Sequence, residues 1–173
     1  DDREAVGGKE APSSGGFIGS DAYGLTFDVH EDIVLDRVQV LADGGGPRTF
    51  QLRSIQAEIL MEISQDLEPG WNAVELGFPI EEGTGYALLV SAPEVGLWRD
   101  NVGSEQAYPY PVGEMATITS STIPSSAGGN YYYFFYDWEV SSQGLLCESE
   151  AAAAYVEVVD AIAGCMYAFA ANL

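Results

Sequence analysis

The residues best suited to chemistry lie close together in the second half of the chain, and they suggest sugar binding. Trp98, Tyr108 and Tyr110 supply flat aromatic faces, and such rings can cover the apolar C–H face of a sugar. Arg99 and Asn101 supply planar groups that can read hydroxyls, and small-ligand sites combine apolar walls with a few polar groups. These five residues are therefore the candidate ligand-binding residues.

The same segment also has a purely structural interpretation. Trp98 and Tyr110 would then be plugs of the core or of a loop, and Arg99 would pair with a carboxylate. Both interpretations stay open at the level of sequence.

Catalytic residues are not assigned, because no convincing set is present. The single histidine, His30, lies among Asp28, Glu31 and Asp32 without a nearby serine or cysteine motif that would complete a triad. Such a histidine is usually a surface or capping residue. Two carboxylates can hydrolyse glycosides, but acids are so abundant here that their presence carries no weight. We expect no enzyme, and a carboxylate-dependent glycoside hydrolase is the least favoured function.

Calcium is the one cofactor that the acidic residues leave open, because this hard cation prefers carboxylate and carbonyl oxygens. The twelve-residue calcium loop with a central glycine does not occur in the sequence. Asp28, Glu31, Asp32 and Asp36 cluster, yet they suit a solvated strand end as well as a metal site. No metal site is assigned, and no other cofactor is expected.

The two cysteines, Cys147 and Cys165, suit neither a CxxC redox motif nor a zinc site. In a secreted protein they could form a disulfide, whereas in the cytosol they would stay reduced. A structural disulfide is somewhat favoured over two unpaired thiols.

The charge balance excludes several classes of partner. The chain has 27 acidic residues against 6 lysines and arginines, a formal net charge of −21. Such a surface repels the phosphates of nucleic acids and the headgroups of anionic membranes. No apolar run is long enough to span a bilayer, and no signal peptide is visible. We therefore expect neither nucleic-acid binding nor membrane insertion.

Apolar and polar residues alternate along most of the chain, with turn signals at short intervals, which predicts antiparallel strands. Together with the aromatic segment described next, they make about ten strands of an all-β, jelly-roll-like antiparallel β-sandwich. The predicted strands are residues 24–29, 33–42, 48–55, 58–64, 71–78, 86–91, 95–99, 114–119 and 155–159.

The segment Asn130–Val140 has seven aromatic residues in eleven positions, preceded by Gly128 and Gly129. Aromatic side chains favour a pleated, half-buried surface over a helix. Both faces of the segment are aromatic, which predicts one strand in the centre of a sheet. Residues 1–20 are rich in glycine and serine and poor in apolar residues, which predicts a flexible leader. The sandwich would then occupy residues 21–160, followed by a tail at 161–173.

Six segments in order carry a resemblance to a known group of proteins. They are Tyr23–Glu31, Val38–Ala42, Arg48–Arg53, Leu97–Asn101, Tyr108–Tyr110 and Tyr131–Val140. They resemble a β-sandwich module that recurs in large secreted and cell-surface proteins of Bacteroidetes, commonly exported by the type IX secretion route. The resemblance covers about residues 20–160. Ala151–Ala154 departs from the group, which usually carries an arginine there.

The resemblance also extends to the end of the chain. In that group the segment equivalent to Tyr136–Val140 is followed by a cysteine and a last strand, as Cys147 and Tyr155–Val159 are here. Residues 163–172 look like the start of a further Cys-bounded repeat, so Cys165 could have its disulfide partner elsewhere.

The resemblance implies an extracellular or cell-surface location and a non-catalytic binding or scaffolding role. Taken with the aromatic residues between Trp98 and Tyr110, it leads us to expect a binding or adhesion module with carbohydrate as one ligand class. The expected partners are a glycan, a surface protein or other copies of the chain. The alternative is a structural subunit of an extracellular filament, in which the leader or the tail reaches a neighbouring subunit by strand exchange.

Overall fold

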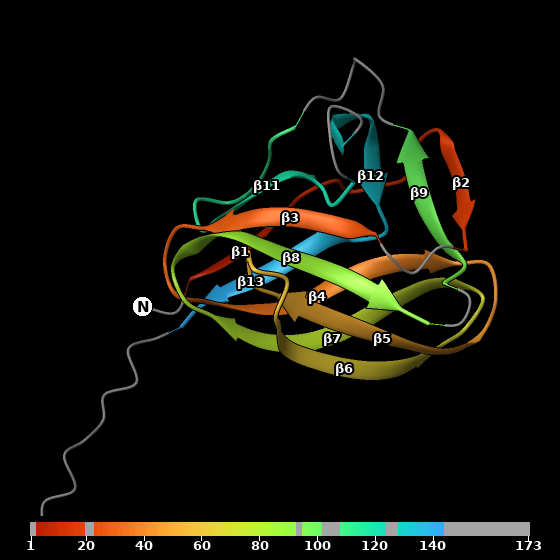
Figure 1. Ribbon diagram of the computed structural model, residues 1–173, viewed down its shortest axis with the longest axis horizontal. Helices are drawn as coiled ribbons and strands as arrows, with labels where there is room; N and C mark the ends of the chain where they lie inside the picture. The colour runs from red at the N-terminus through yellow and green to blue at the C-terminus, as the bar shows by residue number, and fades with distance from the viewer. Residues whose placement is uncertain (1–2, 20–22, 93–94, 102–107, 124–127, 144–173) are drawn as a thin grey trace, which may run out of the picture.

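The computed structural model describes residues 3–19, 23–92, 95–101, 108–123 and 128–143. Within them the chain forms thirteen strands and one 3-10 helix, so the predicted all-β class is confirmed, with more strands than the ten expected (Figure 1). The elements are β1 (Glu4–Gly7), β2 (Gly15–Ile18), β3 (Gly24–Val29), β4 (Ile33–Ala42), β5 (Gly46–Arg53), β6 (Ile59–Leu67), β7 (Gly70–Ile80), β8 (Gly83–Ser91), β9 (Leu97–Asn101), β10 (Tyr110–Val112), β11 (Ala116–Ser121), η1 (Gly128–Asn130), β12 (Tyr131–Tyr133) and β13 (Tyr136–Ser142).

All strand pairs are antiparallel, in the order β12-β9-β4-β13-β1-β10-β11-β3-β8-β5-β6, with β2 beside β9 and β7 beside β4. This continuous sheet folds over on itself, so that β3, β8 and β5 lie against β4, β13 and β7 (Figure 1). Two ring contacts cross between the layers: Phe27 meets Trp138 at a centroid distance of 5.1 Å, and Phe50 meets Phe135 at 6.3 Å. The fold is a sandwich with one aromatic core.

The period-two alternation in the sequence gives the inward faces of the strands. Val74, Leu76 and Phe78 of β7 are buried, and so are Val38 and Val40 of β4. Burying such a side chain contributes about 1.5–3 kcal/mol to folding. The residues between them on β7 are exposed, as expected of a sheet with one solvated face.

The N-terminal segment is not a flexible leader, which corrects the prediction for residues 3–19. Glu4–Gly7 pairs along its whole length with β13, and β2 pairs with β9. Gly7 explains part of the error, because a Cβ at that position would lie 2.4 Å from the carbonyl oxygen of Pro111. A glycine that resembles a linker residue in the sequence in fact permits close backbone packing.

The aromatic segment forms two strands rather than one. Phe134 has a φ of 69° and breaks the strand between β12, which pairs with β9, and β13, which pairs with β4 and β1. The hydroxyl of Tyr132 and the indole N–H of Trp138 both donate to the carbonyl oxygen of Phe135, at 2.8 Å each. This kink directs buried rings into different parts of the core.

Some predictions concern residues beyond the described part of the chain. The cysteines Cys147 and Cys165, the strand predicted at residues 155–159 and the tail at 161–173 lie outside the described residues. Strand β10 lies between the predicted strands 95–99 and 114–119, where the sequence predicted no strand. In the described ranges no helix has the length and apolarity needed to cross a membrane.

Candidate functional site

The five residues predicted to bind a ligand lie on or near β9, but they divide between its two faces. Trp98 lies on one face, and Arg99 and Asn101 lie on the other. Tyr108 and Tyr110 pack on a third ring, Tyr132, at centroid distances of 6.2 and 5.0 Å. They therefore do not form one shared surface.

Arg99 lies over aromatic rings instead of pairing with a carboxylate. Its guanidinium carbon is 4.3 Å from the ring centroid of Tyr131 and 5.7 Å from that of Tyr133, a cation–π arrangement. Its Nη2 donates to Asn101 Oδ1 at 2.8 Å. The Tyr108 hydroxyl donates to the Tyr131 carbonyl oxygen at 2.7 Å. This hydrogen bond helps to position Tyr131, whose ring lies under Arg99.

The buried carboxylate of Asp100 lies on the same face of β9 as Trp98, two residues further along the strand. Asp100 is fully buried, and its Oδ1 accepts hydrogen bonds from the indole N–H of Trp98 at 2.9 Å and the backbone N–H of Ser13 at 2.8 Å. Its Oδ2 lies 2.7 Å from Nζ of the buried Lys9 and 3.2 Å from the hydroxyl of Tyr136. This centre attaches the N-terminal segment to the core, and no local sequence pattern revealed it.

The buried tyrosines of this region predict a steep loss of stability at high pH. Burial is the main cause that raises the pKa of both Tyr132 and Tyr136 above the ordinary value of 10.0. Above pH 10 the unfolded chain loses these protons while the folded chain keeps them, so rising pH favours unfolding. We expect each of the two to remove about 1.4 kcal/mol of unfolding free energy per pH unit above 10. Denaturant unfolding between pH 9 and 12 measures this slope, and a flat profile would contradict it.

The outer face of β2, β9, β4 and β7 carries a row of apolar side chains, which we call the aromatic strip. Phe17 pairs with Trp98 across β2 and β9, and Leu41 pairs with Trp71 across β4 and β7. The two halves join where β4 meets β9. There Ala42 pairs with Leu97, and both point into the core. Their neighbours Leu41 and Trp98 therefore lie on the opposite, outer face.

The aromatic strip is exposed but firmly held. Phe17 is 43% exposed and Trp71 is 50% exposed, while Trp98 and Leu41 are half-buried. Phe17 meets the Trp98 ring edge-on at 5.1 Å, and Trp71 meets the buried Tyr136 ring edge-on at 5.8 Å. Adjacent strands lie about 4.8 Å apart, so four strands give the strip a span of roughly 14 Å.

Of the aromatic strip, Trp98 was predicted from the sequence, and Phe17, Leu41 and Trp71 were not. A signal for Trp71 was present, because its position has the opposite parity to the inward Val74, Leu76 and Phe78. Phe17 carried no such signal, since it lies in the segment expected to be a leader. The prediction that Asn101, Tyr108 and Tyr110 contact a ligand stays a prediction.

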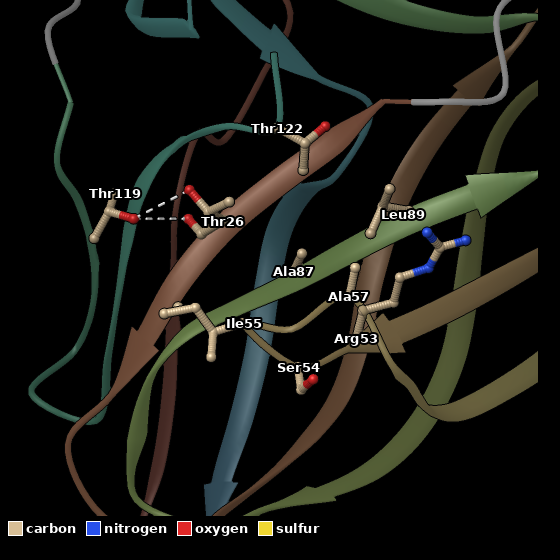
Figure 2. Close-up of a pocket in the computed structure, with 10 residues that line it drawn as sticks. Thr26, Arg53, Ser54, Ile55, Ala57, Ala87, Leu89, Thr119 and Thr122 are labelled. Carbon is tan, nitrogen blue, oxygen red and sulfur yellow. Dashed lines mark hydrogen bonds between the residues drawn. The ribbon is translucent and has the colours of Figure 1, made fainter. Parts of the chain in front are cut away.

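A separate depression lies on the outer face of the other layer (Figure 2). Its volume is about 520 Å³. Thr26 of β3 and Ala87 and Leu89 of β8 line it, and the turn from Ser54 to Ala57 stands at its edge. We call it the β3–β8 pocket.

Three of the four acidic residues considered for calcium, Asp28, Glu31 and Asp32, make hydrogen bonds or an ion pair within the protein. Asp28 Oδ1 accepts from the backbone N–H of Gly85, and Asp32 Oδ1 accepts from that of Glu82, both at 2.8 Å. Glu31 pairs with Arg3. Over the described ranges, no three His, Cys, Asp or Glu residues are grouped so as to hold a metal ion. His30 shares a 2.8 Å hydrogen bond with the Thr117 hydroxyl.

Comparisons with known proteins assign no family. No protein-family model, no curated protein and no solved structure matches the chain. The geometry of the two outer faces therefore indicates the function.

Proposed function

We propose that the chain is a non-catalytic extracellular module that binds carbohydrate through the aromatic strip. The observation that carries this proposal is a half-exposed tryptophan, Trp71, in one row with Leu41, Trp98 and the exposed Phe17. Exposed apolar patches commonly mark binding surfaces. Flat rings on a sheet surface suit the C–H faces of a sugar chain.

Polar groups beside the aromatic strip can read the hydroxyls of such a ligand. Gln39 and Arg37 follow Leu41 on the same face of β4 at two-residue intervals, and Gln39 lies opposite Ala73 of β7. Arg37 is held by ion pairs to Glu75 and Glu139. An amide and a fixed ion-pair network next to a ring are the mixture of groups that orients a polar ligand.

The charge of the chain indicates a neutral glycan for this surface. With a net charge of −21, the protein repels a polyanion before contact is made. The cation nearest to the strip along β4, Arg37, already has two carboxylate partners. A neutral polysaccharide avoids both the repulsion and the need for an unpaired cation.

The alternative function, a filament subunit joined by strand exchange, is less favoured. Its N-terminal arm would have to reach a neighbour, whereas β1 pairs with β13 and β10 of its own chain. Lys9 also belongs to the buried ion pair with Asp100. Exchange would require breaking both sets of contacts.

Replacing Trp71 with alanine is expected to weaken binding to a neutral polysaccharide about thirtyfold, because an aromatic anchor of a binding surface contributes about 2 kcal/mol. Affinity electrophoresis in gels that contain cellulose derivatives, xylan, mannan or β-glucan measures the change. Ile59→Ala is the matched control, because Ile59 is also 50% exposed but lies on β6.

The Trp71→Ala variant should remain folded, since truncating a half-exposed side chain costs little stability. Retention of Trp71→Ala equal to that of the wild type, on a polysaccharide that the wild type binds, would refute the aromatic strip as the binding surface. Equal loss in Ile59→Ala would refute it as well.

A further inference from the structure

The β3–β8 pocket is hollow because small residues form its floor and a fixed turn forms its lip (Figure 2). Ala87 and Thr26 pair across β8 and β3 and present short side chains outward. Ile55, at 67% exposure, packs on Gly85, where a Cβ would lie 2.7 Å from Ile55 Cδ1. The concavity is therefore built from the outer faces of the strands and from the turn after β5.

The lining of the pocket is unusual for so acidic a chain. Among the described residues, the ten that line it include one cation, Arg53, and no aspartate or glutamate. The remainder are hydroxyl-bearing, aliphatic or glycine residues. The pocket thus offers a positive group where most of the surface offers carboxylates.

Arg53 differs from the other basic residues in its partners. Arg3, Lys9 and Arg37 each form an ion pair with a carboxylate. Arg48 donates to backbone carbonyl oxygens. The guanidinium of Arg99 lies over aromatic rings. Arg53 donates from Nε and Nη2 to one neutral amide oxygen, Oε1 of Gln51, at 3.2 and 2.6 Å. Within the described residues no carboxylate forms an ion pair with it.

The orientation of Arg53 is nevertheless fixed. Gln51 is buried, and its Nε2 donates to Glu62 Oε2 at 3.0 Å on the adjacent strand. The amide therefore cannot turn away, and one edge of the guanidinium is held against it. The remaining N–H groups of a planar guanidinium are suited to a carboxylate.

Two hydroxyls of the lining can also donate hydrogen bonds: that of Ser54, next to Arg53 in the chain, and that of Thr122, across the pocket. Ser54 Oγ accepts from the backbone N–H groups of Gln56 and Glu58, and Thr122 Oγ1 accepts from that of Gly24. A hydroxyl that accepts from the backbone keeps its own hydrogen for another acceptor. The chemistry of the lining is thus that of a donor-rich site.

We infer that the β3–β8 pocket is a second binding site, and that it takes a sugar carboxylate, a uronic acid residue. The carboxylate of the uronic acid pairs with Arg53, and its hydroxyls accept hydrogen bonds from Ser54 and Thr122. The C–H face of the sugar ring lies on Ile55 and Leu89. The volume of about 520 Å³ is within the range of small-ligand sites. This site is distinct from the aromatic strip and takes a different class of sugar.

The overall negative charge does not prevent a single carboxylate from binding here. At physiological ionic strength the Debye length is about 8 Å, so distant surface acids are largely screened. The contact with Arg53 is direct and is screened far less.

Titration calorimetry on the intact chain tests the inference with D-glucuronate and D-galacturonate, at constant ionic strength. D-glucose and D-galactose provide neutral matches, and sulfate and phosphate provide inorganic anions. We expect a uronate to bind at least about tenfold more tightly than its neutral match, since a charge-assisted pair is what distinguishes them. Arg53→Gln should lose that advantage, and Arg53→Lys should recover only part of it.

Arg3→Gln is the matched control, because it removes the same charge from an exposed ion pair away from the pocket. Trp71→Ala separates this site from the aromatic strip and should leave uronate binding unchanged. The inference would be overturned by no uronate binding by the wild type, by equal binding of neutral sugars, or by unchanged binding by a folded Arg53→Gln variant. Equal affinity for sulfate or phosphate would also overturn it, in favour of a general anion site.

Discussion

Replacing Lys9 with methionine is expected to lower the free energy of unfolding by about 3–5 kcal/mol, the cost of removing one partner from a buried ion pair. Asp100 is fully buried and lies 2.7 Å from Lys9 Nζ. Without the lysine, the carboxylate would remain in the core with hydrogen bonds but no countercharge. Urea or guanidinium unfolding at neutral pH measures the difference.

Two control variants separate this effect from a general loss of charge. Arg3→Met removes a cation from an exposed pair with Glu31, which should cost about 1 kcal/mol or less. Adding Asp100→Asn to Lys9→Met removes the unpaired charge and should recover part of the loss. A Lys9→Met variant as stable as Arg3→Met would show that the N-terminal segment is not held by this pair.

Replacing Trp138 with alanine is expected to cost about 3–5 kcal/mol, the usual range for a large aromatic deleted from a core. Trp138 is 1% exposed, packs edge-on against Phe27 across the two layers, and donates its indole N–H to Phe135. Its loss would leave a cavity between the layers and loosen the kink after Phe134.

The matched control for this variant is Trp71→Ala, which removes the same side chain from a half-exposed position. It should cost about 1–2 kcal/mol, since half of its surface is already in contact with water. Similar losses in the two variants, measured by denaturant unfolding, would contradict the proposed division between a core tryptophan and a surface tryptophan.

The sequence predicted those strands whose two faces differ. The bounds of β3 and β4 agree with the predicted ranges 24–29 and 33–42, because buried residues alternate there with partly buried ones. β1 and β2 have four residues each, too few to show a period. Their place in the sheet depends on Lys9 meeting Asp100, a contact between residues ninety-one positions apart that no local pattern reveals.

The candidate site was predicted only in part for a related reason. Trp98 was identified from its neighbours along the chain, but those neighbours, Arg99 and Asn101, point to the opposite face of β9. The residues that lie beside Trp98 on its own face, Phe17 and Leu41, come from other strands. Residues next to each other in the sequence of a strand alternate between faces, so a surface site is built across strands.

The most direct test of the aromatic strip follows the indole N–H signals by NMR during titration with neutral oligosaccharides from cellulose, xylan, mannan and chitin. The chain has three tryptophans, so the three signals report separately on Trp71 at the surface, Trp98 beside Asp100 and Trp138 in the core. We expect at least one of these sugars to shift the Trp71 signal most, the Trp98 signal less, and the Trp138 signal least. No shift of Trp71 with any of them, or a larger shift of Trp138, would contradict the proposed function.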